Sequence, residues 1–393
     1  MSDLLDLEAA QTQLLALAPV LPPEQVPVEA MLGRYLAEDV RAARTQPAAN
    51  LSAMDGYALA PGAGPWQLVG ESRAGAPFAG TLTAGQCVRI STGAVLPKGA
   101  DRVLIQEDAA VADGVVRADE LPLPGRDIRP RGFDFAAGDL LLARGTCITP
   151  ARIALMLAAG HSAVAAVRRP RIAVLDSGDE LAADPANCPP YQIPASNGAM
   201  IAAMLAPLGC EVQRLGPIVD DMPALAAALT AAEAADILIT SGGASVGDHD
   251  LIKPALADWG AETTFWKVAI KPGKPLLVAR RGAQVILGLP GNPVSSFVTA
   301  FLFALPLVRA ALGDANPLPR SVVLRAAEAL PAVGKRREFL RAVSDGGSVS
   351  RAGPQDSSAL AALAAADCLI DRSAGGPAVA AGDPVPVIYL RNG

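Results

Sequence analysis

The residues best suited to chemistry lie in three loops between positions 236 and 296. In DILITSGGASVGDHD (236–250), an apolar run typical of a buried strand is followed by glycines, which allow backbone N–H groups to converge on an anion. KVAIKPGKP (267–275) adds lysines, and GLPGNPVSS (288–296) is another turn directly after an apolar strand. Each loop alone could be a plain tight turn, but the three together predict a site for an anionic ligand. The candidate residues are Ser241, Gly242, Gly243, Ser245, Lys267, Lys271, Lys274, Gly288, Pro290, Gly291, Asn292 and Pro293.

Three carboxylates, Glu180, Asp220 and Asp250, each follow the end of one expected strand by a few residues. The carboxyl ends of parallel strands meet at one edge of a sheet, so we expect these side chains to lie together. Oxygen ligands of this kind suit Mg²⁺ held jointly with phosphate oxygens. Each residue could instead cap a helix, and the magnesium hypothesis therefore rests on all three.

The elements expected to position these residues begin at Pro170. Apolar runs at 171–175, 210–216 and 236–240 read as strands, and they alternate with helical segments at 198–209 and 222–235. Such alternation predicts βαβ units and a mostly parallel sheet.

The rest of the chain divides around this α/β part. Two helical segments, 4–18 and 26–40, come first, and a third, from Leu140 to His161, has Thr149 as its N-cap and Pro150 at its first position. Between them, short β-like runs separated by Gly and Pro predict a β-rich insertion. The predicted domains are a helical linking domain at 1–40 and 140–168, a β-rich inserted domain at 41–139, an α/β domain at 169–315 and a small β-rich domain at 316–393.

Polar clusters within the β-rich insertion contain Asp55, Thr92 and Asp134. Asp-Gly and Thr-Gly pairs also form turns readily. The spacing of these residues therefore does not distinguish a role in forming turns from a role in binding or catalysis.

Composition excludes several classes of protein. The net charge of −6 over 393 residues argues against general nucleic-acid binding, and the five cysteines are scattered without a CxxC pair. Only two histidines are present, so any metal should be a hard cation bound by carboxylates. The acidic amino terminus lacks a signal pattern, and we find no run of about 18 uncharged apolar residues, so no membrane span is expected and a cytoplasmic protein is predicted.

The motifs resemble an ordered family set. SAMDGYA, ISTGAVLPKGAD, GFDFAAGDLLLARGTCITP, VLDSGDEL, SNGAM, ILITSGGASVGDHD, KVAIKPGKP and GLPGNP are similar, in order and spacing, to the MoeA family of molybdopterin molybdenumtransferases, which is related to the gephyrin E domain. The resemblance implies a multidomain α/β and β fold: a central MogA-like α/β domain with a mostly parallel sheet, the β-rich inserted domain, the helical linking domain and a C-terminal small β-barrel-like domain.

The resemblance also implies a reaction and partners. The enzyme would insert molybdenum from molybdate into adenylylated molybdopterin with Mg²⁺ and release AMP. It would be a homodimer whose active site lies between the α/β domain of one subunit and the β-rich insertion of the other. Contact with a molybdopterin adenylyltransferase and with acceptor molybdoenzymes or their chaperones is implied as well.

Residue roles follow from the same resemblance. Glu180, Asp220 and Asp250 match the metal- and phosphate-handling acids, and Lys267 and Lys271 match functional lysines, with Lys274 beside molybdate or phosphate. An oxyanion pocket shared with the closing domain would contain Ser295, Arg341, Ser357 and Ser358, and Asp55, Thr92 and Asp134 would complete the catalytic set. Asp176 departs from the family, which commonly has serine there.

Three alternatives remain open at this point. An adenylyltransferase would need only the α/β domain, and a gephyrin-like scaffold would need no chemistry. Tungstate is nearly isosteric with molybdate, so the residues do not distinguish the two oxyanions.

Overall fold

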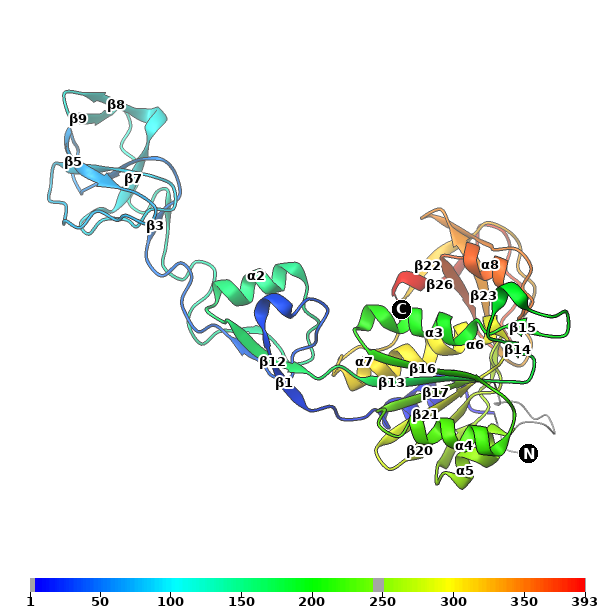
Figure 1. Cartoon of the computed structure of the whole chain (residues 1–393). Helices are drawn as coiled ribbons and strands as arrows, with labels where there is room; N and C mark the ends of the chain where they lie inside the picture. Colours follow the sequence, from blue (N-terminus) through cyan, green and yellow to red (C-terminus); the bar gives the residue numbers. More distant parts are fainter. Residues whose placement is uncertain (1–3, 243–250, 393) are drawn as a thin grey trace.

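The computed structural model describes residues 4–242 and 251–392. The chain is elongated, with a β-rich domain at one end, a small linking domain in the middle, and an α/β domain joined to a C-terminal barrel at the other end (Figure 1). The expected fold class is confirmed, and the exact positions of the domain boundaries stay a prediction.

The α/β domain is built on one six-stranded sheet. Its strands are β13 (Arg171–Ser177), β16 (Glu211–Ile218), β17 (Ile237–Ser241), β18 (Glu262–Trp266), β20 (Leu277–Arg281) and β21 (Gln284–Leu289). They are ordered β16-β13-β17-β21-β20-β18, and β20 alone runs against the others. The other five strands therefore end on the same side, which we call the carboxyl edge.

Alternation along the strands determines which helices cover each face. In β13, Ile172 and Val174 face a cluster with Ile201 of α3 (Asn197–Leu205) and Val294 of α6 (Pro293–Thr299). The residues between them, Ala173 and Leu175, face α4 (Met222–Ala231) and α5 (Ile252–Asp258). Both faces are apolar because helices cover both, as expected for a parallel sheet.

The longest helical segment is continuous from Pro293 to Ala311. It comprises α6, a π-helical stretch (Ala300–Ala304) and α7 (Leu305–Ala311). By length and composition it could cross a membrane, but 89% of its most apolar window is buried inside the protein. Its burial identifies it as a core helix.

The first helix, α1 (Leu7–Leu15), packs against this segment. Its Gln11 side chain donates to the Leu302 carbonyl oxygen at 2.9 Å, and its Leu7 and Leu14 belong to the α/β core. The apolar face of α1 is therefore buried on this segment, and α1 packs with the α/β core and not with α2.

The linking domain is held together by strands. β1 (Pro23–Pro27) pairs with β12 (Ala163–Val167), and β2 (Val40–Arg41) pairs with β11 (Leu140–Leu142). The helix expected at 26–40 does not form; only one 3₁₀ turn (Val28–Ala30) is present there. Pro27 supplies no N–H, and Gly33 has a φ of 72°, which a helix does not allow. The helix after Thr149 is confirmed as α2 (Pro150–Ala158).

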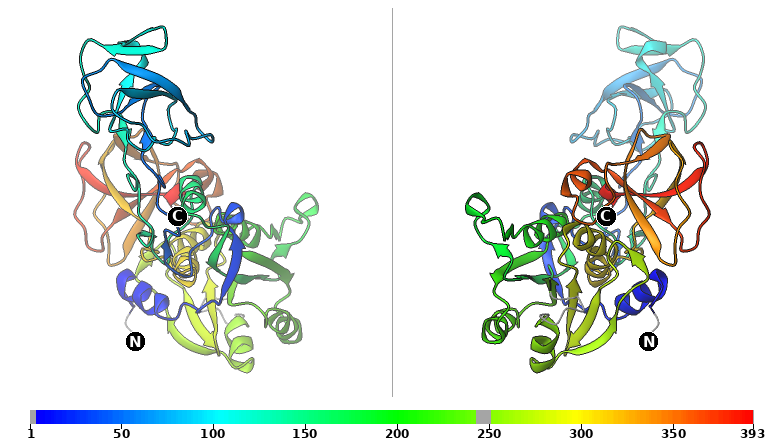
Figure 2. Two further views of the ribbon diagram at one scale, coloured as in Figure 1. Left: turned by 90° about the vertical axis from the view of Figure 1, so that its left-hand side faces the viewer. Right: turned by 90° about the vertical axis from the view of Figure 1, so that its right-hand side faces the viewer.

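Six strands form the sheet of the β-rich domain, and Figure 2 shows this domain from two sides. The strands are β4 (Gly56–Leu59), β5 (Trp66–Ser72), β6 (Gln86–Ile90), β7 (Arg102–Ile105), β8 (Ala109–Ala112) and β9 (Val115–Ala118). A short pair, β3 (Leu51–Ser52) and β10 (Ile128–Arg129), lies where the domain joins the linking domain.

The C-terminal domain is a closed barrel. Its strands are β22 (Ser321–Ala326), β23 (Arg337–Ser344), β24 (Ser348–Arg351), β25 (Cys368–Arg372) and β26 (Pro384–Tyr389), and pairing of β23 with β25 closes the ring. A short helix, α8 (Leu360–Ala365), precedes β25. β19 (Ile270–Lys271), from the α/β domain, joins β23 and so attaches the barrel to the α/β domain.

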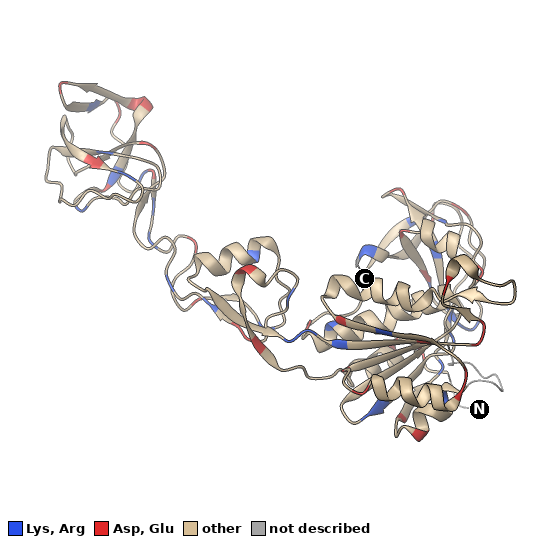
Figure 3. Cartoon of the chain, in the orientation of Figure 1, with Lys and Arg blue, Asp and Glu red and all other residues tan. Residues whose placement is uncertain are grey.

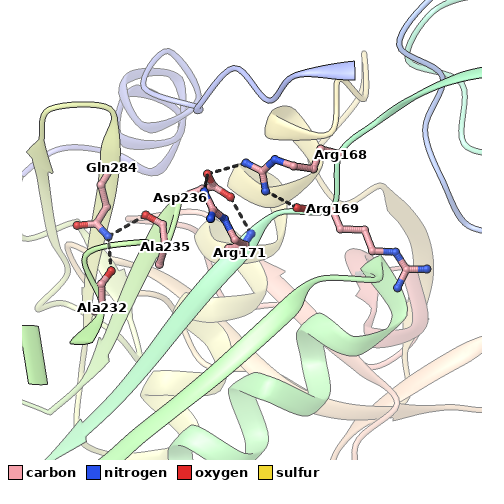
Figure 4. A network of polar contacts seen from close by, with 7 residues as sticks. All are labelled: Arg168, Arg169, Arg171, Ala232, Ala235, Asp236 and Gln284. Carbon is pink, nitrogen blue, oxygen red and sulfur yellow. Dashed lines mark hydrogen bonds and ion pairs between the residues drawn. The ribbon is translucent and has the colours of Figure 1, made fainter. Parts of the chain in front are cut away.

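A polar network ties the linking domain to the amino ends of the α/β strands (Figure 4). Asp236, just before β17, accepts from the Arg168 guanidinium at 2.8 Å and from the Arg171 backbone N–H at 2.7 Å. Nearby, Gln284 donates to the Ala232 and Ala235 carbonyl oxygens. This network lies at the end of the sheet opposite to the carboxyl edge, so it positions domains rather than a ligand.

Candidate functional site

A cavity of about 350 Å³ lies between the α/β domain and the barrel. The 271–275 loop and Ser295 line one side, and residues of β23 and the 355–357 loop line the other. Among the predicted site residues, Lys271, Lys274, Ser295 and Ser357 meet here. Two residues that the sequence analysis did not select, Arg336 and Asp356, also line the cavity.

The lysine loop owes its shape to β19 and to Gly273. Lys271 pairs in register with Glu338, and its Nζ lies 2.9 Å from Glu338 Oε1. Gly273 is buried with a φ of 101°, and a Cβ there would lie 2.5 Å from Cγ2 of Thr299. Only glycine fits both the backbone and the space. Lys274 follows, is exposed, and makes no ion pair with any described residue.

The opposite wall is fastened to the start of α6. Asn292 donates from Nδ2 to Ser357 Oγ at 3.0 Å, and the Val294 N–H donates to the Ser357 carbonyl oxygen at 3.2 Å. Asp356 accepts from the hydroxyl and the N–H of Ser358, which hold the pKa of its carboxyl below the usual range. Ser358 therefore supports the loop, whereas Ser357 lines the cavity.

Arg341 lies behind this wall and is 1% exposed. Its Nη2 donates to the carbonyl oxygens of Pro354 and Asp356, and Gln355 binds its backbone at both the N–H and the carbonyl. Burial lowers the pKa of the guanidinium. Arg341 is not among the lining residues, so the structure gives it a role in positioning the 354–356 loop.

Arg336 is the cation that sequence reasoning missed. It lies just before β23, donates from Nη1 to the Ile270 carbonyl oxygen at 3.4 Å and lines the cavity. The only available signal was its place in the basic run before REFLRA. With Lys271 and Lys274 it gives the cavity three cations against two carboxylates, Glu338 and Asp356. Such a charge pattern suits a small oxyanion.

The predicted acids lie at the carboxyl edge. The Asp220 N–H donates to Asp179 Oδ1 at 3.0 Å, and burial, followed by the charges of Asp179 and Glu180, raises the pKa of the Asp220 carboxyl. Glu180 and Asp220 are thus brought close enough to repel each other. Asp250 lies outside the described residues, and within the described ranges no group of three or more acidic, His or Cys side chains forms a metal site.

Unpartnered polar atoms mark the ends of β13 and β17. The buried atoms without a hydrogen bond include Asp176 Oδ1, Ser177 Oγ, Asn197 Oδ1, Thr240 Oγ1 and Ser241 Oγ. Buried polar atoms of this kind normally have hydrogen-bond partners. Their grouping beside the glycine loop indicates that the carboxyl edge of the sheet binds a ligand.

The glycine loop begins where these atoms lie. Gly242 has a φ of 96°, and a Cβ there would lie 2.6 Å from the Ser177 carbonyl oxygen. Gly243 and Ser245 lie outside the described residues.

The GLPGNP turn connects the end of β21 with α3 and α6. Gly288 lies within β21, where a Cβ would approach Leu277 Cβ to 2.9 Å, and Pro290 follows the strand. The Gly291 carbonyl oxygen accepts from Asn197 Nδ2 at 2.7 Å, and Asn292 and Pro293 begin α6. The turn thus places Ser295 and the 355–357 loop relative to the sheet.

The predicted residues of the β-rich part lie away from this cavity. Asp55 Oδ1 accepts from the Thr92 N–H at 2.6 Å, so those two residues are together. The Asp134 N–H donates to the Gln46 carbonyl oxygen at 3.0 Å, beside the linking domain. Within one chain, the β-rich domain and the α/β domain are at opposite ends of the molecule (Figure 1).

Acidic and basic residues are interspersed along all parts of the chain (Figure 3).

Lys267 is not among the lining residues of the cavity; its Nζ lies over the Trp266 ring, 3.8 Å from the centroid.

Comparison with known proteins decides the family. The profile of the MoeA N-terminal region (domain I and II) matches residues 5–160, that of a probable molybdopterin binding domain matches 173–310, and that of the MoeA C-terminal region (domain IV) matches 323–390. A molybdopterin molybdenumtransferase of Haemophilus influenzae is 36% identical over 312 residues, covering 78% of this chain and 77% of that protein. The chain belongs to the MoeA family.

Further relatives of this MoeA family member cover nearly its whole length. Molybdopterin molybdenumtransferase 2 of Mycobacterium tuberculosis is 37% identical over 388 residues, covering 93% of this chain and 94% of that protein. A crystal structure of a molybdopterin biosynthesis MoeA protein from Pyrococcus horikoshii superposes with a TM-score of 0.84 at 29% identity, covering 98% of this chain and 99% of that one. The resemblance inferred from the motifs is confirmed.

Proposed function

We propose that this protein transfers molybdenum from molybdate into adenylylated molybdopterin with release of AMP. Membership of the MoeA family supports the molybdotransferase role. The single observation that carries the proposal is the cavity in which Lys271, Lys274 and Arg336 meet Ser295 and Ser357. Lysine, arginine and hydroxyl donors are the groups that desolvate a tetrahedral dianion.

The cavity favours this reaction over adenylylation alone. Its lining comes from both the α/β domain and the barrel, and Lys271 and Glu338 bridge the two. An adenylyltransferase that uses only the α/β domain would have no need of the barrel side. A scaffold would have no need of an oxyanion site.

Magnesium belongs to the proposal through Glu180, Asp220 and Asp250. Repulsion from Asp179 and Glu180 contributes to the raised pKa of the Asp220 carboxyl, as expected where acidic side chains gather to hold a cation. When bound, Mg²⁺ would neutralise charge on the phosphates of the substrate. The protein's own contribution would be to hold the substrate phosphates at the carboxyl edge, near the oxyanion cavity.

A homodimer is proposed for a geometric reason. Asp55 and Thr92 contact each other at the end of the molecule remote from the cavity. If these residues act with Lys271, a second copy must bring its β-rich domain to the carboxyl edge. Acceptor molybdoenzymes or their chaperones would take the product, a molybdopterin adenylyltransferase would supply the substrate, and a cytoplasmic location fits both.

The test is an assay of the purified protein with adenylylated molybdopterin, molybdate and Mg²⁺, following AMP release. Molybdate-dependent release of AMP is expected, and it should be lost in Lys271→Ala. Adenylylation of molybdopterin from ATP without molybdate-dependent AMP release would replace this proposal by the preceding reaction. Inactivity in both assays would favour a scaffold.

A further inference from the structure

The GLPGNP turn is held in place by a side chain from another element. Its two prolines, Pro290 and Pro293, supply no N–H group, so the turn can make few hydrogen bonds of its own. Nδ2 of Asn197 donates to the Gly291 carbonyl oxygen at 2.7 Å, and in the described part of the chain no other hydrogen bond holds Gly291. Asn197 is the first residue of α3, so this one bond joins the start of α3 to the start of α6.

The start of α3 is fixed in turn by β13. Asp176, in β13, accepts from the Gly198 N–H at 3.1 Å through Oδ2. A Cβ at position 198 would lie 2.1 Å from that oxygen, so glycine leaves the space that the carboxylate occupies. Ser196, the residue before α3, makes no capping hydrogen bond, and Asp176 therefore supplies the acceptor for this helix start. Asn197 is thereby set at a defined place relative to the sheet.

Two further hydrogen bonds lead from the turn to the oxyanion cavity. Asn292, directly after Gly291, donates from Nδ2 to Ser357 Oγ at 3.0 Å, and the Val294 N–H donates to the Ser357 carbonyl oxygen at 3.2 Å. Ser357 lines the cavity, and so does Ser295, in the first turn of α6. A shift of the turn would therefore displace both of these serines.

The other end of the Asn197 amide is unpaired. Oδ1 is buried and has no hydrogen-bond partner, and it cannot be exchanged with Nδ2 because the Gly291 oxygen requires a donor. An unpaired buried acceptor destabilises a folded protein. Global stability therefore gives no reason for asparagine at this position, whereas the bond to the turn does.

We propose that Asn197 is a positioning residue for the oxyanion cavity. It fixes the GLPGNP turn and, through Asn292, the wall that carries Ser357. The inference rests on the proposed function, and it gives the SNGAM segment a role that the motif resemblance did not assign. Asn197 is not among the lining residues, so it acts on molybdate through the wall and not by contact.

The experiment uses the full-length protein with two variants of similar side-chain size. Asn197→Asp keeps Oδ1 and removes the donor, and Asn197→Leu removes both polar atoms. Both should raise the KM for molybdate by about fivefold, because the turn loses one hydrogen bond, while kcat changes by less than about twofold. The KM for adenylylated molybdopterin should also change by less than about twofold. Asn197→Leu should unfold near the wild-type temperature, because it loses a hydrogen bond and an unpaired oxygen together.

Asn187→Leu is the matched control. Asn187 is exposed and donates from Nδ2 to Asp184 Oδ2 at 2.6 Å, so its bond stays within its own turn. This variant should leave both KM values unchanged. A molybdate KM in the Asn197 variants equal to that of the control would overturn the proposal. Equal increases in the two KM values would also overturn it, because they indicate a general structural defect.

A double variant tests the path through the turn. Asn292→Ala removes the donor to Ser357, and Asn197→Leu added to it should raise the molybdate KM by less than the product of the two single effects. Effects that multiply fully would show that Asn197 does not act through Asn292, and the proposal would fail.

Failure of the proposed function would be visible separately, because calorimetric titration with molybdate alone needs no turnover. Wild-type protein without molybdate-dependent AMP release, but with a molybdate affinity that falls about fivefold in Asn197→Leu, would contradict the transferase proposal and support the positioning role. Normal turnover with a molybdate affinity unchanged by Asn197→Leu would do the reverse.

Discussion

Lys271 of the α/β domain donates to Glu338 of the barrel across 2.9 Å, and both residues line the cavity. The pair therefore fixes the orientation of one cation in the oxyanion site and joins two domains. Lys271 remains half exposed, so the ion pair adds little to global stability. Its importance should lie in the geometry of the cavity.

Glu338→Gln tests this role. The amide keeps the size of the side chain but removes the charge that orients the Lys271 ammonium. We expect turnover to fall by about tenfold and the free energy of unfolding to change by less than about 1 kcal/mol. Molybdate affinity should not weaken, because a negative charge leaves the cavity. Steady-state kinetics and urea unfolding measure both effects, and weaker molybdate binding would contradict this assignment.

Gly273→Ala tests the shape of the lysine loop. The new Cβ would lie 2.5 Å from Thr299 Cγ2 on a backbone with a φ of 101°. We expect a loss of about 2–3 kcal/mol in the free energy of unfolding, together with loss of molybdate binding. Gly282→Ala is the control, since its φ is 57° and nothing lies within 4 Å of its Cβ position. It should cost about 1–2 kcal/mol and leave molybdate binding intact. Equal behaviour of the two variants would rule out the close packing at Gly273 as the cause.

Arg341→Met tests whether this buried arginine supports the cavity wall. The carbonyl oxygens of Pro354 and Asp356 would lose their shared donor, at a cost of about 2–4 kcal/mol. The 354–356 loop should loosen, which hydrogen exchange of its amides would detect, and the KM for molybdate should rise. A variant with normal stability and only a lower kcat would instead place Arg341 in direct contact with substrate.

Asp176 should make stability depend on pH. Burial raises the pKa of its carboxyl, although Arg214 and the Gly198 N–H act in the other direction. In the folded state the group keeps its proton to a higher pH than in the unfolded state. Its effect on the free energy of unfolding is therefore most favourable below the ordinary aspartate pKa of about 4 and is lost as the pH rises through the folded pKa.

The comparison is urea unfolding of wild type and Asp176→Asn across this range. The neutral side chain has no charge to bury, so wild type should lose stability relative to the variant as the pH rises. Parallel pH curves for the two proteins would show that the carboxyl is not perturbed.

Sequence patterns predicted the parts that depend on local chemistry. The apolar run Ile237–Thr240 and the helix at Thr149-Pro150 formed as expected because buried strands and helix starts have clear local signals. The prediction of a helix at 26–40 was wrong because it relied on the apolar spacing and gave too little weight to Pro27 and Gly33. Pairing with β12 determines the structure at the start of this segment.

Sequence patterns did not predict which residues line the cavity. Arg336 and Arg341 lie in one basic motif, and only the alternation of β23 and the packing of the barrel place one in the cavity and the other behind its wall. The distance of Asp55 and Thr92 from Lys271 is likewise a property of the assembled domains. No local pattern encodes it.

The most direct test of the central claim is a crystal structure of the full-length protein soaked in molybdate, with diffraction data collected at the molybdenum absorption edge. The account predicts an anomalous peak in the cavity, in contact with Lys271, Lys274 and Ser357. A molybdenum peak at another place, with this cavity empty, would contradict the account.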